Sequence, residues 1–210
     1  MFFNYLFTQP LFAIATLLGI IYALTIHEFF HAFVATSLGD DTAKNESRLT
    51  LNPLAHIDFI GFLMLLFIGF GWGKPVPFNP SNLRNQKYGP AIIAFAGPLS
   101  NIISCFIFIG ILKYLIPFLN LSPSDLLIHF LSYLIIINIV LAVFNLIPIP
   151  PLDGSKILFA ILPDRFENFK ISLEQNGPFV LIGLLLLDNL FNLGIFNCLF
   201  NWIISLSNLI

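Results

Sequence analysis

The sequence predicts an all-α polytopic membrane protein with about five membrane helices, within a range of roughly four to six, and a single domain over residues 1–210. Composition is the first reason. Of the residues 58% are hydrophobic and 10% are charged, against about 45–50% and about 25% in soluble domains. The second reason is the length of the apolar stretches 11–26, 91–116 and 126–149, which approach or exceed the roughly 20 residues needed to cross the hydrocarbon core.

The first half of the chain predicts one long helix followed by a return segment. A helix from about 11 to 38 ends at Gly39, before the polar residues 40–58. The apolar segment 59–71 is too short to cross alone, so we expect a re-entrant segment that returns to the side it left. Residues 72–90 are rich in Pro, Gly and Asn, which predicts an extended loop.

The second half predicts two long helices and a less regular end. Helices are expected at about 91–116 and 126–147, and the second stops at the prolines of NLIPIPPLDG. A short helix near 154–162 and a charged stretch to 177 precede a final apolar region. That region, 178–210, either crosses once or forms a broken hairpin.

Charge and cysteine content exclude several classes. The net charge is -2 and no basic stretch occurs, so no nucleic-acid partner is expected. Cys105 and Cys198 lie in apolar runs without the spacing of paired ligands, which favours packing roles. The partner that the apolar composition predicts is the lipid bilayer.

The segment HEFFH, residues 27–31, predicts a metal site. Residues four apart on a helix share a face, so His27 and His31 can bind one metal ion. Glu28 stands beside them, where a carboxylate can take a proton from water without being a ligand. In a soluble helix these residues could simply be a polar face. In a membrane helix ionisable side chains are costly and usually functional, which favours the metal.

Asp153 is the best candidate for the third ligand that a catalytic zinc requires. It follows a helix broken by prolines, and irregular backbone at membrane depth is tolerated only beside protein or a water-filled cavity. The alternative is a helix cap, because Asp153 directly precedes GSKILFAIL. His129 and Asp188 are weaker candidates.

These residues resemble the site-2 protease family of intramembrane zinc metalloproteases, especially its short bacterial members without added soluble domains. HEFFH is similar to the family's zinc motif, LDG at 152–154 to its distal Asp motif, and AGPLSN at 96–101 to the motif of an intervening helix. The resemblance covers most of residues 20–155. It implies that His27, His31 and Asp153 bind Zn²⁺, that Glu28 activates water, and that the substrates are transmembrane segments of other proteins.

Three further residues are candidates for contact with the substrate or the oxyanion. Gly97 and Asn101 are four apart and favour close helix packing with a hydrogen bond across the bundle. Asn145 could direct its amide at the oxyanion of the tetrahedral intermediate. Alternatively, Asn145 satisfies a carbonyl freed by Pro148.

Two features of the loops are open to two interpretations. His56 and Asp58 either brace their loop, which is the favoured interpretation, or form a second metal site. Pro75 and Pro77 remove amide donors from one edge of an extended segment. The other edge, at Lys74, Val76 and Phe78, would then be free to pair with an unwound substrate.

The sequence therefore predicts an intramembrane zinc metalloprotease, and the resemblance implies a role in regulated intramembrane proteolysis or in clearing signal-peptide remnants. The alternatives are a zinc-binding membrane scaffold without catalysis and a zinc transporter. Glu28 argues against the scaffold. A transporter would show polar residues along a path across both leaflets, whereas the functional groups here gather on one side. The oligomeric state stays open.

Basic residues predict the orientation. All but Lys113 lie on the side where HEFFH and Asp153 meet, if 59–71 re-enters. The positive-inside rule then places the catalytic side in the cytoplasm and the N-terminus outside, in a bacterial inner (cell) membrane. The basic residues on the catalytic side are Lys44, Arg48, Lys74, Arg84, Lys87, Lys156, Arg165 and Lys170.

Overall fold

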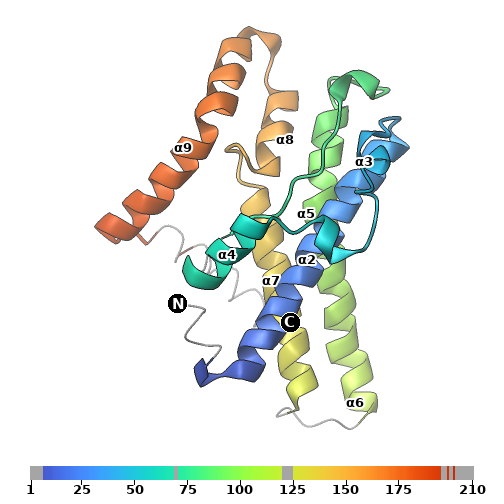
Figure 1. The fold of residues 1–210 in the computed structure, drawn as a ribbon, viewed down its shortest axis with the longest axis vertical. Coiled ribbons are helices and arrows are strands. Elements are labelled where there is room, and N and C mark those ends of the chain that lie inside the picture. The colour runs from blue at the N-terminus through green and yellow to red at the C-terminus, as the bar shows by residue number, and fades with distance from the viewer. Residues whose placement is uncertain (1–6, 69–70, 120–124, 195–197, 199–200, 202–210) are drawn as a thin grey trace.

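The computed structural model describes residues 7–68, 71–119, 125–194, 198 and 201, and all regular structure in these ranges is helical. Single turns of 3₁₀ or π-helix join several of the longer elements (Figure 1). The α-helices are α2 (Pro10–Ser37), α3 (Thr42–Asn45), α4 (Phe59–Ile68), α5 (Gly89–Gly110), α6 (Ile116–Phe118), α7 (Leu126–Asn145), α8 (Asp153–Ile161) and α9 (Glu167–Phe191).

Four helical stretches in the described part are long and apolar enough to cross a membrane: Pro10–Ser37, Gly89–Phe118, Leu126–Asn145 and Asp164–Asp188. This is the lower end of the predicted range. The charged stretch before 177 is itself helical from Glu167, so α9 begins earlier than expected. Most of the chain beyond Gly194 lies outside the described residues, and with it the question of a broken hairpin.

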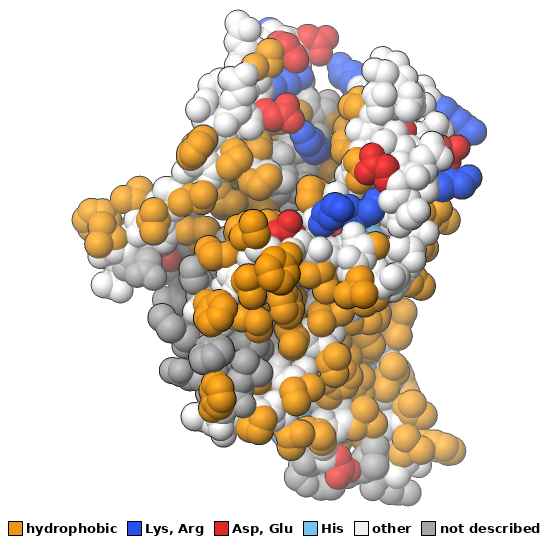
Figure 2. Space-filling model, in the orientation of Figure 1, with side chains coloured by type: hydrophobic (Ala, Val, Ile, Leu, Met, Phe, Trp, Pro, Cys, Tyr) orange, Lys and Arg blue, Asp and Glu red, His pale blue; other side chains and the backbone are white. Residues whose placement is uncertain are grey.

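Helices α2, α5 and α7 form the central bundle, and small residues let them approach closely (Figure 1). Ala23 and Ala32 of α2, Ala96 of α5 and Ala142 of α7 are all buried. Many large side chains point outward instead, as Phe118 does with 80% of its surface exposed. On the face shown, hydrophobic side chains cover most of the lower half of the molecule, and the Lys and Arg side chains and most of the acidic ones lie in the upper half (Figure 2). This distribution is the one expected of a protein surrounded by lipid.

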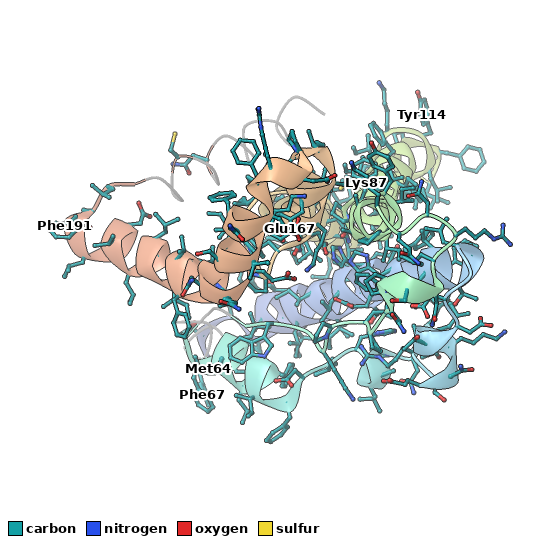
Figure 3. The ribbon with its side chains drawn as sticks, turned by 90° about the horizontal axis from the view of Figure 1, so that it is seen from above. Met64, Phe67, Lys87, Tyr114, Glu167 and Phe191 are labelled. Atoms are coloured by element: carbon teal, nitrogen blue, oxygen red, sulfur yellow. The ribbon has the colours of Figure 1, made fainter. Side chains whose placement is uncertain are left out.

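Segment 58–72, which contains α4, leaves the bundle and returns to the same place. Ile57 and Gly73 form an antiparallel bridge, and the Lys74 N–H donates to the His56 carbonyl at 2.8 Å. A Cβ at Gly61 would lie 2.1 Å from the Trp72 carbonyl oxygen. The start and the end of the segment therefore touch at a position that requires glycine. Met64 and Phe67 lie on α4 at the edge of the molecule (Figure 3).

Asp40, just after α2, fastens the loop that follows this segment. Its buried carboxylate accepts hydrogen bonds from the Asn79 N–H, the Asn82 amide and both donors of Thr42. Burial alone would raise the pKa of Asp40, but these hydrogen bonds outweigh it and hold the pKa below its usual range. Leu83 then packs into a small core with α2 and α5. The loop is therefore fixed across the upper ends of both helices.

The return of segment 58–72 makes a testable prediction about topology. Cysteines introduced as Asn45→Cys and Asn85→Cys, after replacement of Cys105 and Cys198, should both react with an impermeant thiol reagent from one side of the membrane. Phe118→Cys at the other end of the bundle should react only from the opposite side. Reaction of positions 45 and 85 from opposite sides would contradict the fold.

Candidate metal centre

His27 and His31 lie in the C-terminal half of α2 and are buried inside the bundle. Their four-residue spacing places them one above the other on one helix face. Their rings are 4.6 Å apart between centroids, and only 3% and 7% of their surfaces are exposed. Buried imidazoles without partners would be costly in such a place, so their hydrogen bonds have to be accounted for atom by atom.

Asp153 reaches the same place from the start of α8. The chain leaves α7 at Asn145, passes through a cis peptide bond between Pro150 and Pro151, and enters α8 at Asp153. A Cβ at Gly154 would lie 2.2 Å from the Leu146 carbonyl oxygen. The glycine of the LDG motif is therefore needed because the first turn of α8 lies directly on the end of α7.

The three side chains bring one ligand atom each to a common point. Asp153 Oδ2 lies 3.0 Å from His27 Nε2 and 3.2 Å from His31 Nε2, and all the ligand atoms lie within 4.8 Å of one another. Ligands on a tetrahedral zinc, at about 2.0–2.1 Å from the metal, are about 3.3 Å apart. The cluster thus has the dimensions of a zinc site. Among the described residues it is the one group of His, Cys, Asp and Glu that could hold a metal ion.

The hydrogen bonds of the two imidazoles leave the correct nitrogen for a metal. His31 Nδ1 donates to the Ile93 carbonyl at 2.7 Å, and His27 Nδ1 lies 2.7 Å from the Asn101 Oδ1 atom. Both partners are oxygen acceptors, so each of the two Nδ1 atoms carries a hydrogen. Asp153 Oδ2 lies within hydrogen-bond distance of both Nε2 atoms, and a metal ion bound between them would take the Nε2 lone pairs, as it does with metal-binding histidines whose Nδ1 atom donates to an oxygen.

Gly97 of α5 leaves the space beside these nitrogens open. A Cβ at this position would lie 2.5 Å from His31 Nε2 and 2.6 Å from His27 Nε2. Real Cβ atoms do not approach so closely, so only glycine fits against this face of the cluster. The open space at Gly97 and the hydrogens on the two Nδ1 atoms together mean that these residues fit a bound zinc ion.

Glu28 lies one residue from His27 and is 8% exposed. Its Oε2 atom accepts a hydrogen bond from the Val76 N–H at 3.1 Å. The interpretation of Lys74 and Val76 as a free edge for substrate is therefore wrong for these two groups. The Lys74 N–H donates to the His56 carbonyl and the Val76 N–H donates to Glu28, so this part of the chain lies against the Glu28 side chain.

Arg48 is a residue near the site that sequence reasoning missed. It is 4% exposed, and its Nη2 atom donates to the Lys74 carbonyl. Burial lowers the pKa of Arg48, and the negative charges of Glu28 and Glu46 oppose that shift. Arg48 therefore fastens segment 74–78 and adds a positive charge near Glu28. No local motif marks this role, since the contact joins two loops.

Asn101 and Asn145, the two asparagine candidates, differ in how many of their amide hydrogens are engaged. Asn101 is fully buried, and both hydrogens of its amide are engaged, one by the Ala23 carbonyl and one by the Asn138 side chain. Asn101 thus has no donor left for an oxyanion. The Asn145 amide donates to the Leu141 carbonyl at 3.0 Å, which accounts for one of its two hydrogens.

His56 and Asp58 hold their own loop. His56 Nε2 lies 2.8 Å from the Thr50 carbonyl, and Asp58 accepts from the Gly61 N–H. These bonds favour the bracing interpretation over a second metal site. His129 lies in the first turn of α7, about 24 Å along the helix from Asn145.

Fold and site together define a class: a polytopic helical membrane protein with a buried cluster of two histidines and one aspartate, and with a glutamate beside it. The model of peptidase family M50 matches residues 116–187, a range that contains Asp153 but not HEFFH. No solved structure matches the chain significantly.

Three relatives, each named as a "putative zinc metalloprotease", extend the match. YwhC of Bacillus subtilis is 39% identical over 79% of this chain and 77% of its own. Rip2 of Mycolicibacterium smegmatis is 30% identical over 82% of this chain and 67% of its own. MJ0611 of Methanocaldococcus jannaschii is 32% identical over 73% of this chain and 76% of its own. The chain belongs to peptidase family M50, the site-2 protease family of zinc metalloproteases, and this membership implies Zn²⁺ as its cofactor.

The space at Gly97 predicts the effect of one added methyl group. Gly97→Ala should displace the two imidazoles from their positions. They cannot move without loss, because their Nδ1 atoms are hydrogen-bonded to Asn101 and to the Ile93 carbonyl. Zinc affinity, measured by competition with a chelator, should fall at least about 10-fold, the smaller loss seen when an outer-shell partner is removed.

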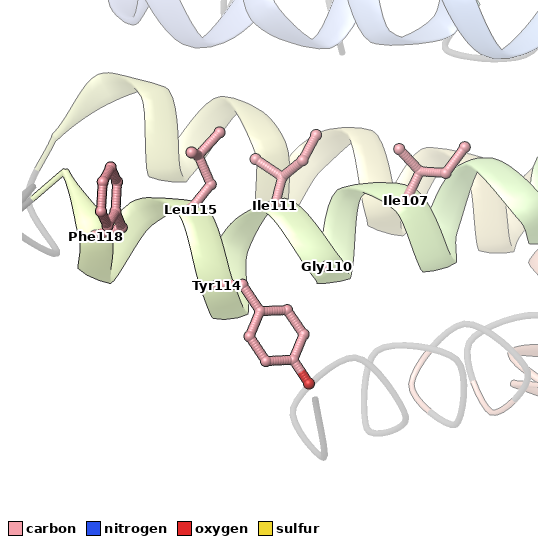
Figure 4. A pocket seen from close by; sticks show the side chains of 6 residues that line it. All are labelled: Ile107, Gly110, Ile111, Tyr114, Leu115 and Phe118. Atoms are coloured by element: carbon pink, nitrogen blue, oxygen red, sulfur yellow. The ribbon is translucent and has the colours of Figure 1, made fainter.

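A second glycine on the same helix provides the control. Gly110 faces an open apolar groove at the far end of α5, and nothing lies within 4 Å of a Cβ placed there (Figure 4). Gly110→Ala should therefore leave zinc affinity unchanged. Equal zinc affinity in the Gly97→Ala and parent proteins would show that the space at Gly97 is not needed by the metal.

Proposed function

We propose that this protein is an intramembrane metalloprotease that hydrolyses peptide bonds in or near transmembrane segments of other membrane proteins. One observation carries the proposal: a buried ligand cluster lies inside a bundle of helices that are apolar enough to span a membrane. His31 and His27 precede Ser37, the end of α2, by about 9 and 15 Å at 1.5 Å per residue. Peptide bonds that reach the cluster must therefore enter below the membrane surface.

The proposed roles follow from the positions of the side chains. His27, His31 and Asp153 are the metal ligands, and zinc when bound supplies Lewis-acid polarisation and makes water more acidic. Glu28 takes a proton from the attacking water and returns it to the leaving amine. The Val76 N–H holds the Glu28 carboxylate in place by a hydrogen bond, and Arg48 fixes the segment that carries Val76 by donating to the Lys74 carbonyl.

Asn145 is the proposed donor to the oxyanion. It ends α7, and the contact between Gly154 and Leu146 brings that end beside the first turn of α8, where Asp153 lies. Only one of its amide hydrogens is used within α7, which leaves the second for a substrate oxygen.

The proposed orientation places the site on the cytoplasmic side of a bacterial inner membrane. Lys and Arg side chains gather at the top of the molecule, where α3 and the connection between α8 and α9 lie (Figure 2). Segment 58–72 begins and ends on this side, and exposed Phe59 and Phe67 suit it to dip into the adjacent leaflet as a re-entrant segment.

The roles of ligand and base can be separated by substitution. Alanine in place of His27, His31 or Asp153 should lower both the zinc content and the cleavage of labelled transmembrane peptides in liposomes. Glu28→Gln keeps the volume and the three ligands but cannot accept a proton, so zinc should remain while turnover falls about 10²- to 10⁴-fold.

Two controls complete this experiment. His129→Ala and Asp188→Asn should retain the parent's zinc content. Full zinc content in Asp153→Ala would refute its role as a ligand. Undiminished turnover in Glu28→Gln would leave a metal-binding scaffold or transporter as the better description.

The role of Asn145 is tested by removing its amide. Asn145→Ala should retain zinc and lower kcat by about 10²- to 10³-fold, the typical effect of losing one oxyanion donor. Asn176→Ala is the matched control, because Asn176 makes the same bond to the carbonyl four residues earlier but on the exposed part of α9. Equal kcat values for these two variants would limit Asn145 to a helix contact.

A further inference from the structure

Two asparagine side chains without any exposed surface meet between α5 and α7. The Asn101 Nδ2 atom donates to the Asn138 Oδ1 atom at 2.9 Å. Polar side chains inside a helical membrane bundle are rare and usually serve a purpose. Asn101 contacts His27, but Asn138 has no part in the site as described above.

Backbone carbonyls fix the direction of each hydrogen bond in this network. Asn138 Nδ2 lies 2.7 Å from the Leu134 carbonyl, which can only accept, so Asn138 must turn its Oδ1 toward Asn101. Asn101 Nδ2 also lies 3.0 Å from the Ala23 carbonyl. Asn101 therefore faces two acceptors, and both require its amino group.

This direction reaches the candidate metal ligand. With its amino group committed, Asn101 presents Oδ1 to His27 Nδ1 at 2.7 Å, and an oxygen acceptor requires the imidazole hydrogen on Nδ1. A flipped Asn101 amide would set its oxygen against two other oxygens and would place the hydrogen on His27 Nε2. In that tautomer the lone pair is on Nδ1, and Nε2, the nitrogen that lies beside Asp153, has none for a metal.

We propose that Asn138 is a positioning residue for the metal centre, which acts through Asn101 to hold His27 in its metal-binding tautomer. The inference rests on the proposed ligand role of His27. His31 needs no such relay, because its Nδ1 atom donates directly to the backbone carbonyl of Ile93. The two imidazoles thus reach the same tautomer by different routes.

The test is a double-mutant cycle on zinc affinity, measured by chelator competition on the full-length protein in detergent. Asn101→Ala should weaken zinc binding about 10- to 100-fold, and Asn138→Leu about 10-fold in the same direction. Because Asn138 acts through Asn101, adding Asn138→Leu to Asn101→Ala should produce no further loss. A double variant whose loss is the product of the two single losses would show an independent packing effect and overturn the proposal.

Controls separate this inference from the proposed metal site. Ser104→Ala removes a buried hydroxyl that bonds to the Ser100 carbonyl and the Tyr22 hydroxyl, one turn from Asn101, and should leave zinc affinity unchanged. Asn138→Ala should repeat the loss seen with Asn138→Leu, and a loss confined to the bulkier variant would contradict the proposal. Parent-like affinity in both Asn138 variants, with binding lost in His27→Ala, would refute the role of Asn138 alone. Parent-like affinity in His27→Ala would refute the metal centre and the inference together.

Discussion

The proposed metal site requires two buried imidazoles on α2 to present Nε2 atoms without hydrogens toward Asp153. That requirement places an oxygen acceptor at each Nδ1 atom, the Ile93 carbonyl for His31 and the Asn101 side chain for His27. Both acceptors come from α5, so α5 must lie against α2 along the length of the metal motif. Small residues such as Ala96 and Gly97 permit this approach.

The same constraint explains the unusual backbone around Asp153. A carboxylate can join the cluster only if the chain ends α7 and starts α8 at the depth of the histidines. The prolines of the loop end α7, and Gly154 allows the new helix to begin against the old one. Gly177 in turn permits α9 to pack against Pro150 in the loop between α7 and α8.

Local patterns in the sequence predicted the parts of this structure that depend on neighbouring residues. The spacing of His27 and His31, the proline break before Asp153 and the short apolar segment 59–71 are of this kind. The structure brings His27, His31 and Asp153 together and returns 58–72 to its starting point. The bounds of α2 and α7 agree with expectation within about two residues, which is the usual uncertainty of helix ends.

Contacts between distant segments were beyond prediction. Nothing in the sequence near Val76 indicates that its N–H reaches Glu28, or that Arg48 lies buried beneath the same segment. Gly97 indicated close packing, but the atoms that it approaches are the ligand nitrogens themselves. Asn138 resembles any polar residue of an apolar helix until the direction of its hydrogen bonds is known.

The central claim is that one zinc ion is bound by His27, His31 and Asp153. X-ray absorption at the zinc edge of the purified protein tests it most directly, because imidazole, oxygen and sulfur ligands give different scattering. We expect a four-coordinate shell of nitrogen and oxygen at about 2.0–2.2 Å, with scattering from two imidazoles and none from sulfur. A sulfur ligand, which would have to come from Cys105 or Cys198 or from a methionine, or a shell with fewer than two imidazoles, would contradict the account.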